Sequence, residues 1–182
     1  MATVLYMSMS LDGFIAGPNE TDDNGLGDGG ERLHEWPITG QIYDEFMATG
    51  AIVAGRGTFE PAGGWRGDHH GGVPIFIVSR HEPPARFAQM PLVTYLDDVE
   101  TAFRLAREAA GDTNVLVHGA RIAQQALAAG LLDELEIHLI PVLLGQGRRL
   151  FDNLAAEQIE LERVRVLEWD AGVTHIRYRV KR

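Results

Sequence analysis

The segment TNVLVHGARIAQQALAAGLLDELEIHLIPVLLGQGRRLFDN, residues Thr113–Asn153, decides the fold because a strand, a turn, a helix and a second strand follow one another in it. Residues 115–117 are apolar and mostly β-branched, as expected of a strand buried on both faces. Apolar residues then recur at helical spacing over 122–127, and Gly130 stands where a left-handed C-terminal cap is expected. Residues 118–120 therefore form the turn from a strand into a helix.

This turn, His118-Gly119-Ala120, is a candidate site for an anion. The first backbone N–H groups of a helix have no partner inside the helix, and small residues let a phosphate approach them closely. The alternative is that Gly119 and Ala120 are small for packing alone, because a single Gly-Ala pair is a weaker signal than a full G-x-G-x-x-G motif. The turn by itself leaves both interpretations open.

The second half of the segment predicts a strand that leaves the sheet. Residues 135–139 alternate as a strand does, and residues 141–147 form an apolar run broken by Gly145 and Gly147. Leu150 and Phe151 are then expected to pack back under the sheet.

The whole chain has the size and composition of one domain, residues 1–182. It has 182 residues, of which 45% are hydrophobic, and no apolar run approaches the roughly 18 residues of a membrane span. The sequence opens directly into a strand-like stretch without a leader pattern, so a cytoplasmic protein is the default expectation. The absence of Cys excludes disulfides and thiolate chemistry.

The charge balance limits the possible partners. Sixteen Lys and Arg residues stand against 26 Asp and Glu, for a net charge of -10, which argues against nucleic acid or an anionic membrane as a partner. A small anionic ligand would need a local basic pocket. No metal site is expected: His69 and His70 are adjacent, so their side chains diverge, and no third ligand stands at a familiar spacing, which favours a solvated loop.

Two further strands end in cationic or small residues. The strand at 51–54 runs into Gly55, Arg56 and Thr58, and the strand at 74–78 runs into Ser79-Arg80. Arg56 can bind a phosphate with its guanidinium while Thr58 offers a hydroxyl near a helix start; alternatively, Arg56 pairs with an acid and Thr58 caps the helix. Ligands of open α/β sheets bind beyond the carboxyl ends of strands, so parallel strands would bring these motifs to the turn at 118–120.

The remaining segments complete a mixed α/β sheet. Strands are expected at 4–9 and 90–95, an amphipathic helix at 41–49, and a second helix up to Ala110 that begins with a capping box of Asp97 and Glu100. Residues 158–167 and 173–180 alternate as an antiparallel hairpin. The Gly- and Asp-rich loop at 20–31 is either a lid or a plain surface excursion.

With these residues in place, the chain resembles the dihydrofolate-reductase-like superfamily. Within it, the chain is most similar to the reductase domain of bifunctional riboflavin-biosynthesis deaminase/reductases and their stand-alone relatives. The resemblance covers nearly the whole length and rests on five stretches: SMSLDGFIAG, GRGTFE, VSR, VLVHGARIAQQALAAGLLDELEIHLIPVLLGQGRRLFD and GVTHIRYRV. At 182 residues we expect the stand-alone form, because a preceding deaminase domain does not fit in that length.

The resemblance implies a fold and a cofactor. The fold is an α/β, mostly parallel sheet flanked by helices with an antiparallel C-terminal hairpin, and the cofactor is NADPH lying across the strand ends. Position by position, Gly55, Arg56 and Thr58 match the motif at the pyrophosphate and the adenosine 2′-phosphate side. Ser79 and Arg80 match the pair beside the adenosine ribose and its 2′-phosphate. The resemblance also assigns a position at the pyrophosphate and nicotinamide to Gly119, Ala120, Arg121 and Ile122. It assigns a position at the nicotinamide to Ser8, Ile15 and Ala16.

The resemblance also implies a reductase, dihydrofolate reductase-like or 5-amino-6-(5-phosphoribosylamino)uracil reductase-like, that acts on a small, flat heterocycle. The pterin-binding carboxylate of folate reductases has no convincing match in the helix at 41–49, so folate reduction is in doubt. Asp12, Asp44, Glu45 and Glu60 are weak candidates for a proton donor, each better explained as a turn or cap residue. No catalytic residue can be assigned with these alone.

Two alternatives remain open. A cofactor-binding sensor or accessory protein without turnover would keep the same pocket and lack a catalytic carboxylate. A self-associating module would use the C-terminal hairpin and the segment at 141–145, the region in which relatives dimerise, so a homodimer is expected in either case.

Overall fold

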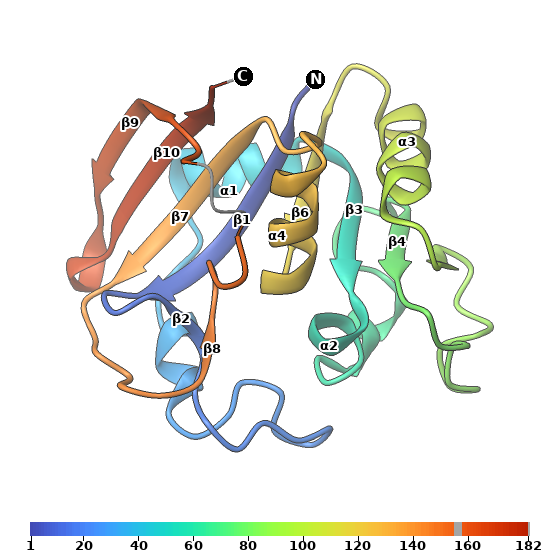
Figure 1. Ribbon diagram of the computed structural model, residues 1–182, viewed down its shortest axis with the longest axis horizontal. Coiled ribbons are helices and arrows are strands. Elements are labelled where there is room, and N and C mark those ends of the chain that lie inside the picture. Colours follow the sequence, from blue (N-terminus) through green and yellow to red (C-terminus); the bar gives the residue numbers. More distant parts are fainter. Residues whose placement is uncertain (155–157, 182) are drawn as a thin grey trace.

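The computed structural model of the protein describes residues 1–154 and 158–181. In this part of the chain, eight strands form one sheet in the order β5-β4-β3-β6-β1-β7-β10-β9. Figure 1 shows this sheet from β4 to β9. The strands are β1 Thr3–Ser10, β2 Phe14–Ala16, β3 Thr49–Gly55, β4 Ile75–Val78, β5 Val93–Leu96, β6 Asn114–His118, β7 Glu134–Ile140, β8 Arg148–Arg149, β9 Leu161–Glu168 and β10 Thr174–Val180. The helices are α1 Gly40–Met47, α2 Arg56–Phe59, α3 Val99–Ala110 and α4 Ala120–Ala128, with short 3-10 turns η1 Gly30–His34, η2 Gly63–Gly67 and η3 Asp170–Gly172.

The strand directions confirm the expected fold class. From β5 to β7 every neighbouring pair is parallel, whereas β10 runs antiparallel to β7 and β9 antiparallel to β10. The strands β2 and β8 form a separate two-stranded sheet below the end of β1. The sheet is thus mostly parallel, with the C-terminal hairpin as its antiparallel edge.

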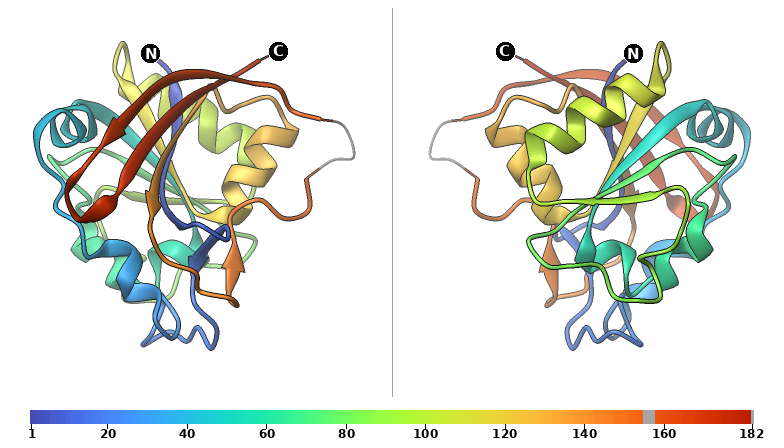
Figure 2. Two further views of the ribbon diagram at one scale, coloured as in Figure 1. Left: turned by 90° about the vertical axis from the view of Figure 1, so that its left-hand side faces the viewer. Right: turned by 90° about the vertical axis from the view of Figure 1, so that its right-hand side faces the viewer.

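Helices cover both faces of the sheet, α3 and α4 on one side and α1 on the other (Figure 2). The alternation along β1 follows from this arrangement, because successive side chains of a strand point to opposite faces. Leu5 and Met7 belong to the core cluster with α3 and α4, while Tyr6 packs against the cluster on the opposite face.

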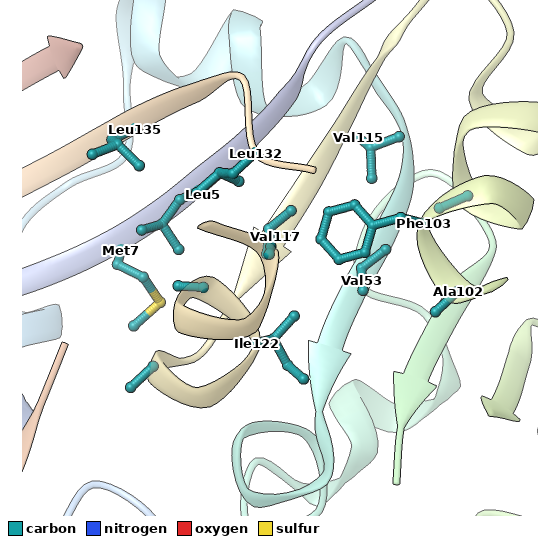
Figure 3. Packing of buried hydrophobic residues seen from close by; sticks show 14 of the residues in the cluster. Leu5, Met7, Val53, Ala102, Phe103, Val115, Val117, Ile122, Leu132 and Leu135 are labelled. Atoms are coloured by element: carbon teal, nitrogen blue, oxygen red, sulfur yellow. The ribbon is translucent and has the colours of Figure 1, made fainter. Parts of the chain in front are cut away.

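Phe103 of α3 is one of the largest fully buried side chains of the larger core cluster. In Figure 3 the Phe103 ring lies beside Val53 of β3 and Val115 of β6, and all three side chains are fully buried. Leu150, at the end of the Thr113–Asn153 segment, is also fully buried in this cluster, and Phe151 packs against it. The expected return of these two residues under the sheet is therefore confirmed.

One helix start differs from the prediction. The cap of α3 is Asp98, whose Oδ2 accepts a hydrogen bond from Thr101 N at 2.7 Å, so the capping box of Asp97 and Glu100 is wrong by one residue. Asp98 has an extended backbone and the helix begins at Val99, which places its carboxylate over the first turn. Asp97 is consequently left facing the strand ends.

The face under α1 carries buried charges rather than a purely apolar core. Glu45 of α1 accepts hydrogen bonds from Arg165 and Arg177, and Arg165 also contacts the buried Glu136 at 3.0 Å. Beside them, the Nδ1 atoms of His138 and His175 lie 2.6 Å apart, and both residues are completely buried. The antiparallel hairpin is thus attached to β7 and α1 by polar contacts.

Some apolar side chains stay exposed in the region where self-association was expected. Val164 and Val166 on β9 are 43% and 45% exposed, and Leu143 is 69% exposed. The homodimer stays a prediction. Among the described residues, no helix is both long enough and apolar enough to cross a membrane.

We expect Phe103→Ala to lower the free energy of unfolding by about 3–5 kcal/mol, because it removes a fully buried ring and leaves a cavity. Urea denaturation measures this change. Val164→Ala, on the exposed face of β9, is the control and is expected to cost less than about 1 kcal/mol. Equal losses in the two variants would contradict the central position of Phe103.

The buried histidine pair predicts a loss of stability in mild acid. Burial lowers the pKa of His138 and His175, that of His175 to about 4, whereas both titrate near 6.5 when unfolded. Because the unfolded chain takes up these protons first, the pair contributes stability above pH ~6.5 that is lost as the pH falls toward 4. As the pH is lowered from 7.5 to about 4, the urea midpoint of unfolding should therefore fall less steeply in the double variant His138→Asn/His175→Asn than in the wild type. The control is His81→Gln, at an exposed histidine, which should behave as the wild type does. An unchanged slope in the double variant would refute this origin.

Candidate functional site

The carboxyl ends of the parallel strands meet at one edge of the sheet, the lower edge in Figure 1, where α2, β2 and β8 lie. The strands β4, β3 and β6 are neighbours there, and each runs into one of the motifs expected to bind a phosphate. Arg56 and Thr58 follow β3, Arg80 follows β4, and Gly119 follows β6. The three motifs thus open onto a common edge.

These motifs line one open pocket of about 740 Å³, called here the arginine pocket. Its lining consists of strand ends, the first turns of α2 and α4, and the segment around β8. The lining residues are Gly55, Arg56, Gly57, Thr58, Val78, Ser79, Arg80, His81, Asp97, Gly119, Ala120, Arg121, Ile122, Gln124, Gln125, Gly147, Arg148, Arg149, Asp152 and Asn153.

The arginine pocket is basic although the chain is acidic. Five arginines and two aspartates line it among the described residues, in a chain of net charge -10. Arg56 Nε lies 3.2 Å from Glu60 Oε2, so the expected pairing of Arg56 with an acid occurs, and 44% of its side chain still faces solvent. No carboxylate of residues 1–154 and 158–181 pairs with Arg80 or Arg121. The pocket therefore offers uncommitted positive charge.

Gly119 is required by the geometry of the turn. Its φ is +96°, and a Cβ built on it would lie 2.4 Å from Thr58 Oγ1, so the β6–α4 turn touches α2 directly. Thr58 does not cap α2, because Gly55 occupies the cap position and no side chain bonds there. The packing interpretation of Gly119 thus holds, and the same close approach keeps the turn open toward the pocket.

Of the backbone N–H groups at the β6–α4 turn that could bind an anion, one is already used inside the described part of the protein and the others are not. The N–H of Gly119 donates to Met7 Sδ at 3.3 Å, which removes it as a donor to a ligand. The first i to i−4 hydrogen bond of α4 runs from Ala123 N to Gly119 O, so the N–H groups of Ala120, Arg121 and Ile122 precede it at the helix start. All three residues line the arginine pocket.

A second cavity of about 600 Å³, called here the aromatic cavity, adjoins the arginine pocket. Gly57, Thr58 and Arg148 line both. Ring side chains make up much of its wall, and loop residues from 20–31 close one side. The other lining residues are Tyr6, Met7, Ser8, Ile15, Ala16, Glu20, Asp23, Asn24, Gly25, Leu26, Glu31, His34, Trp36, Ile38, Phe46, Pro61, Ala62, Trp65, His69 and His118.

Arg148 stands at the junction of the two spaces. Its strand β8 pairs with β2, with Arg148 opposite Ala16. The guanidinium lies 2.8 Å from Glu20 Oε2 and 3.5 Å from the carbonyl oxygen of Gly57. Arg148 therefore connects α2 with the loop at 20–31, and no pattern in the sequence had singled it out.

Hydrogen bonds fix the floor of the aromatic cavity. Trp36 Nε1 donates to Ser8 Oγ at 3.0 Å and to Leu33 O at 3.1 Å. The Trp36 ring also packs on the buried rings of His138 and His175, with centroids 4.6 and 5.0 Å away. Ser8 is thus held by a neighbour that sequence reasoning missed, and both side chains line the cavity.

Histidines form one wall of the cavity, which corrects the expectation of a solvated loop at 69–70. His70 is buried, with its Nε2 2.8 Å from Thr49 Oγ1, and the Nδ1 atoms of His69 and His70 are also 2.8 Å apart. Left-handed backbone at Gly63, Gly64 and Trp65 folds the loop inward. No group of three or more His, Cys, Asp or Glu within the described ranges could hold a metal ion.

The wall histidines are uncharged near neutral pH. Burial lowers the pKa of His118 to about 4 and that of His69 to about 2, and in each case a neighbouring histidine lowers it further. A hydrogen bond with the backbone of Tyr6 opposes the shift of His118. His118 Nε2 is buried and has no hydrogen-bond partner among the described residues. It is therefore a neutral polar atom in a wall made mostly of rings.

The residues carried over for NADPH divide between the two spaces. Ser8, Ile15 and Ala16 line the aromatic cavity, and the remaining nine line the arginine pocket: Gly55, Arg56, Thr58, Ser79, Arg80, Gly119, Ala120, Arg121 and Ile122. Their binding role stays a prediction.

The weak candidates for a proton donor lie outside both spaces. Asp12 accepts hydrogen bonds from Ser10 and from the backbone of Leu144 and Gly145, and Asp44 is exposed on α1. Glu45 pairs with Arg165 and Arg177, and Glu60 pairs with Arg56 and accepts from Tyr95. Asp12 is a turn residue, as the sequence favoured. Glu45 and Glu60 are instead paired with arginines.

The loop at 20–31 lines the aromatic cavity and is hydrogen-bonded to Gly17 and Pro18, which follow β2. Gly17 N donates to Leu26 O at 2.7 Å, and Asp28 N donates to Pro18 O at 2.8 Å. A Cβ on Gly27 or Gly17 would lie 2.3 or 2.0 Å from backbone oxygen, so the loop packs tightly on itself. Its acids Glu20, Asp23 and Glu31 were not recognised as cavity residues from sequence, because Gly- and Asp-rich composition is typical of any surface loop.

The model of the RibD C-terminal domain matches residues 3–175. The chain belongs to the RibD C-terminal domain family. A relative at 29% identity over 171 residues, covering 85% of both chains, is the uncharacterized protein YwjB of Bacillus subtilis (strain 168).

Solved structures of riboflavin-biosynthesis proteins share the fold. A putative riboflavin biosynthesis protein from Shewanella sp. PV-4 superposes with a TM-score of 0.77 at 23% identity, and each chain is covered completely. RibD of Acinetobacter baumannii superposes with a TM-score of 0.65 at 19% identity, and this chain spans 59% of its length. The resemblance to this branch of the dihydrofolate-reductase-like fold is thereby confirmed.

Within this RibD C-terminal domain, Gly119→Ala is expected to lower the free energy of unfolding by roughly 2–4 kcal/mol. The substitution combines a left-handed backbone position with a clash against Thr58, each of which costs energy. Gly130→Ala, at the other end of α4, is the matched control: its φ is +64°, and its Cβ would meet nothing within 4 Å. Urea denaturation compares the two, and equal costs would show that Thr58 does not constrain the turn.

Proposed function

We propose that the protein is an NADPH-dependent oxidoreductase that transfers a hydride to a small heterocyclic, pterin- or pyrimidine-like substrate. The observation that carries the proposal is the convergence of the Arg56, Arg80 and Gly119 motifs on one basic pocket that adjoins an aromatic cavity. Membership of the RibD C-terminal domain family supports the same reaction class.

The residues present fit a dinucleotide phosphate. Arg56, Arg80 and Arg121 offer guanidinium groups of a kind that binds phosphate with two parallel hydrogen bonds. The N–H groups at the start of α4 add neutral donors, and the close approach of Gly119 to Thr58 keeps side chains out of the turn. In this proposal Arg80 with Ser79 would hold the 2′-phosphate, and Ser8, Ile15 and Ala16 would hold the nicotinamide.

When bound, NADPH would supply the hydride, and the chain's own residues would orient the acceptor. The rings of the aromatic cavity present flat surfaces on which a heterocycle can stack. The proton that balances hydride transfer is not supplied by charged histidine, since burial keeps His69 and His118 neutral. The proton would then come from water or from a carboxyl group. Glu20 lines the cavity, and burial raises its pKa while Arg148 opposes that shift.

One observation favours a second function, a sensor or accessory protein that binds NADP(H) without turnover. Asp12, Asp44, Glu45 and Glu60 all lie outside the aromatic cavity, and Glu20, which lines it, is already paired with Arg148 at 2.8 Å. Steady NADPH consumption with any pterin, pyrimidine or dicarbonyl compound in a panel would eliminate this second function. Saturable NADPH binding without consumption across the panel would favour it.

We expect saturable NADPH binding by fluorescence titration, with NADH binding more weakly. Arg80→Ala should weaken NADPH binding roughly tenfold to a hundredfold, the loss expected for a hydrogen-bonded charge pair, and leave NADH binding nearly unchanged. Arg104→Ala is the control, because Arg104 lies exposed on α3 and pairs with Glu108 at 2.8 Å. An equal loss for both cofactors in Arg80→Ala would count against 2′-phosphate recognition, and no NADPH binding by the wild type would overturn the proposed function.

A further inference from the structure

We infer that the aromatic cavity selects uncharged ring compounds and rejects substrates that carry a phosphate or carboxylate group. This inference deepens the proposed function and rests on it, because the cavity is taken as the substrate site. It concerns the charge of the substrate, which neither the reaction class nor the fold determines.

The first argument is the charge on the cavity wall. Three carboxylates line it, those of Glu20, Asp23 and Glu31, against Arg148 as the one Lys or Arg among the described lining residues. Arg148 already lies 2.8 Å from Glu20, so that pair is internally compensated. Asp23 and Glu31 have no cationic partner within residues 1–154 and 158–181. An anionic group entering the cavity would therefore lose hydration and meet like charge.

The second argument is that the histidines cannot compensate an anion. Three histidines line the cavity, His34, His69 and His118, and burial lowers the pKa of each of them. Charging His69 or His118 beside the other, with centroids 5.0 Å apart, would add repulsion. Neutral imidazoles offer hydrogen bonds and flat faces, which suit an uncharged heterocycle.

The third argument is a buried polar atom without a partner. His118 is 8% exposed, and its Nε2 makes no hydrogen bond with any described residue, which is costly unless a ligand or water completes it. The Tyr6, Trp65 and His69 rings surround His118, with centroids 5.9, 5.8 and 5.0 Å away. A ring N–H or O–H of the substrate would satisfy this atom while the ring packs against its neighbours.

The arginine pocket gives the contrast within the same molecule. It holds five arginines, and Arg148 is the only one of these five that also lines the aromatic cavity. The two adjoining spaces therefore differ sharply in charge, one suited to phosphates and the other to uncharged rings. A substrate with its own phosphate would find its cations only on the cofactor side.

The test compares matched pairs of ligands, pterin with pterin-6-carboxylate and uridine with uridine 5′-monophosphate. Quenching of tryptophan fluorescence reports binding, because Trp36 and Trp65 line the cavity. The titrations use protein saturated with NADP⁺ and are repeated with inorganic phosphate in its place, so that the arginine pocket does not capture the anionic group. We expect the uncharged member of each pair to bind at least about tenfold more tightly, about 1.4 kcal/mol.

Removing the carboxylates separates charge from size. In Asp23→Asn/Glu31→Gln the preference for the uncharged member should shrink by about threefold or more, and Glu35→Gln should leave it unchanged. Glu35 is the matched control, because it follows η1 but does not line the cavity and pairs with Arg32 at 3.5 Å. An anionic member that binds as tightly as its neutral partner would overturn the inference.

Two other outcomes would also overturn it. A preference that persists unchanged in the double variant would show selection by size, and an absence of quenching by every ligand would show that the cavity does not take ring compounds. NADPH binding, measured separately by its own fluorescence, distinguishes these outcomes from failure of the proposed function. Cofactor binding and consumption with an anionic substrate would leave the reductase intact and refute only the selection by charge.

Discussion

The contact between Gly119 and Thr58 is the constraint on which the site depends. A Cβ at Gly119 would come within 2.4 Å of Thr58 Oγ1, so the turn after β6 and the helix after β3 touch with no side chain between them. This approach requires β3 and β6 to be parallel neighbours that end at the same level of the sheet, which they are. The gathering at one edge of the motifs expected to bind phosphate is thus a consequence of strand direction and of the absence of a Cβ at Gly119.

The same contact explains why the two spaces adjoin. Gly57 and Thr58 of α2 form part of the wall of both the arginine pocket and the aromatic cavity, and Arg148 reaches across from β8 to the carbonyl of Gly57. A longer side chain at position 57 would meet Arg148, since its Cβ would lie 3.4 Å from the guanidinium. The absence of a side chain at Gly57 thus leaves room for Arg148 at the junction of the two spaces.

Much of the fold could be predicted because local patterns and chain direction agree. The buried strands, α4, the hairpin and the return of Leu150 each follow from periodicity and glycine positions within a few residues of sequence. The convergence of Arg56, Arg80 and Gly119 followed from the rule for open parallel sheets, which needs no side-chain detail. Where the local signal was ambiguous by one residue, as between Asp97 and Asp98, the prediction failed at that residue.

The aromatic cavity could not be predicted because its residues come from segments with no shared pattern. Tyr6, Trp36 and His118 lie far apart in sequence and meet only through sheet order, and His69 reaches the wall because glycines fold its loop inward. Arg148 had no motif at all, and its position depends on pairing between β8 and β2. Tertiary contacts position such residues, and the spacing of residues in the sequence carries little information about tertiary contacts.

Charge is distributed over the site in a way that net charge alone does not indicate. The chain carries a net charge of -10, yet the strand ends gather five arginines in the pocket while the loop at 20–31 and η1 bring carboxylates to the neighbouring cavity. Charges a few ångströms from a bound group in a partly desolvated space act on it more strongly than the overall charge of the chain does, so these two charge distributions would distinguish ligand groups. On this proposal, one edge of the sheet would bind a dinucleotide and an uncharged ring side by side. The phosphates of the dinucleotide would meet arginines, and the ring would meet aromatic side chains.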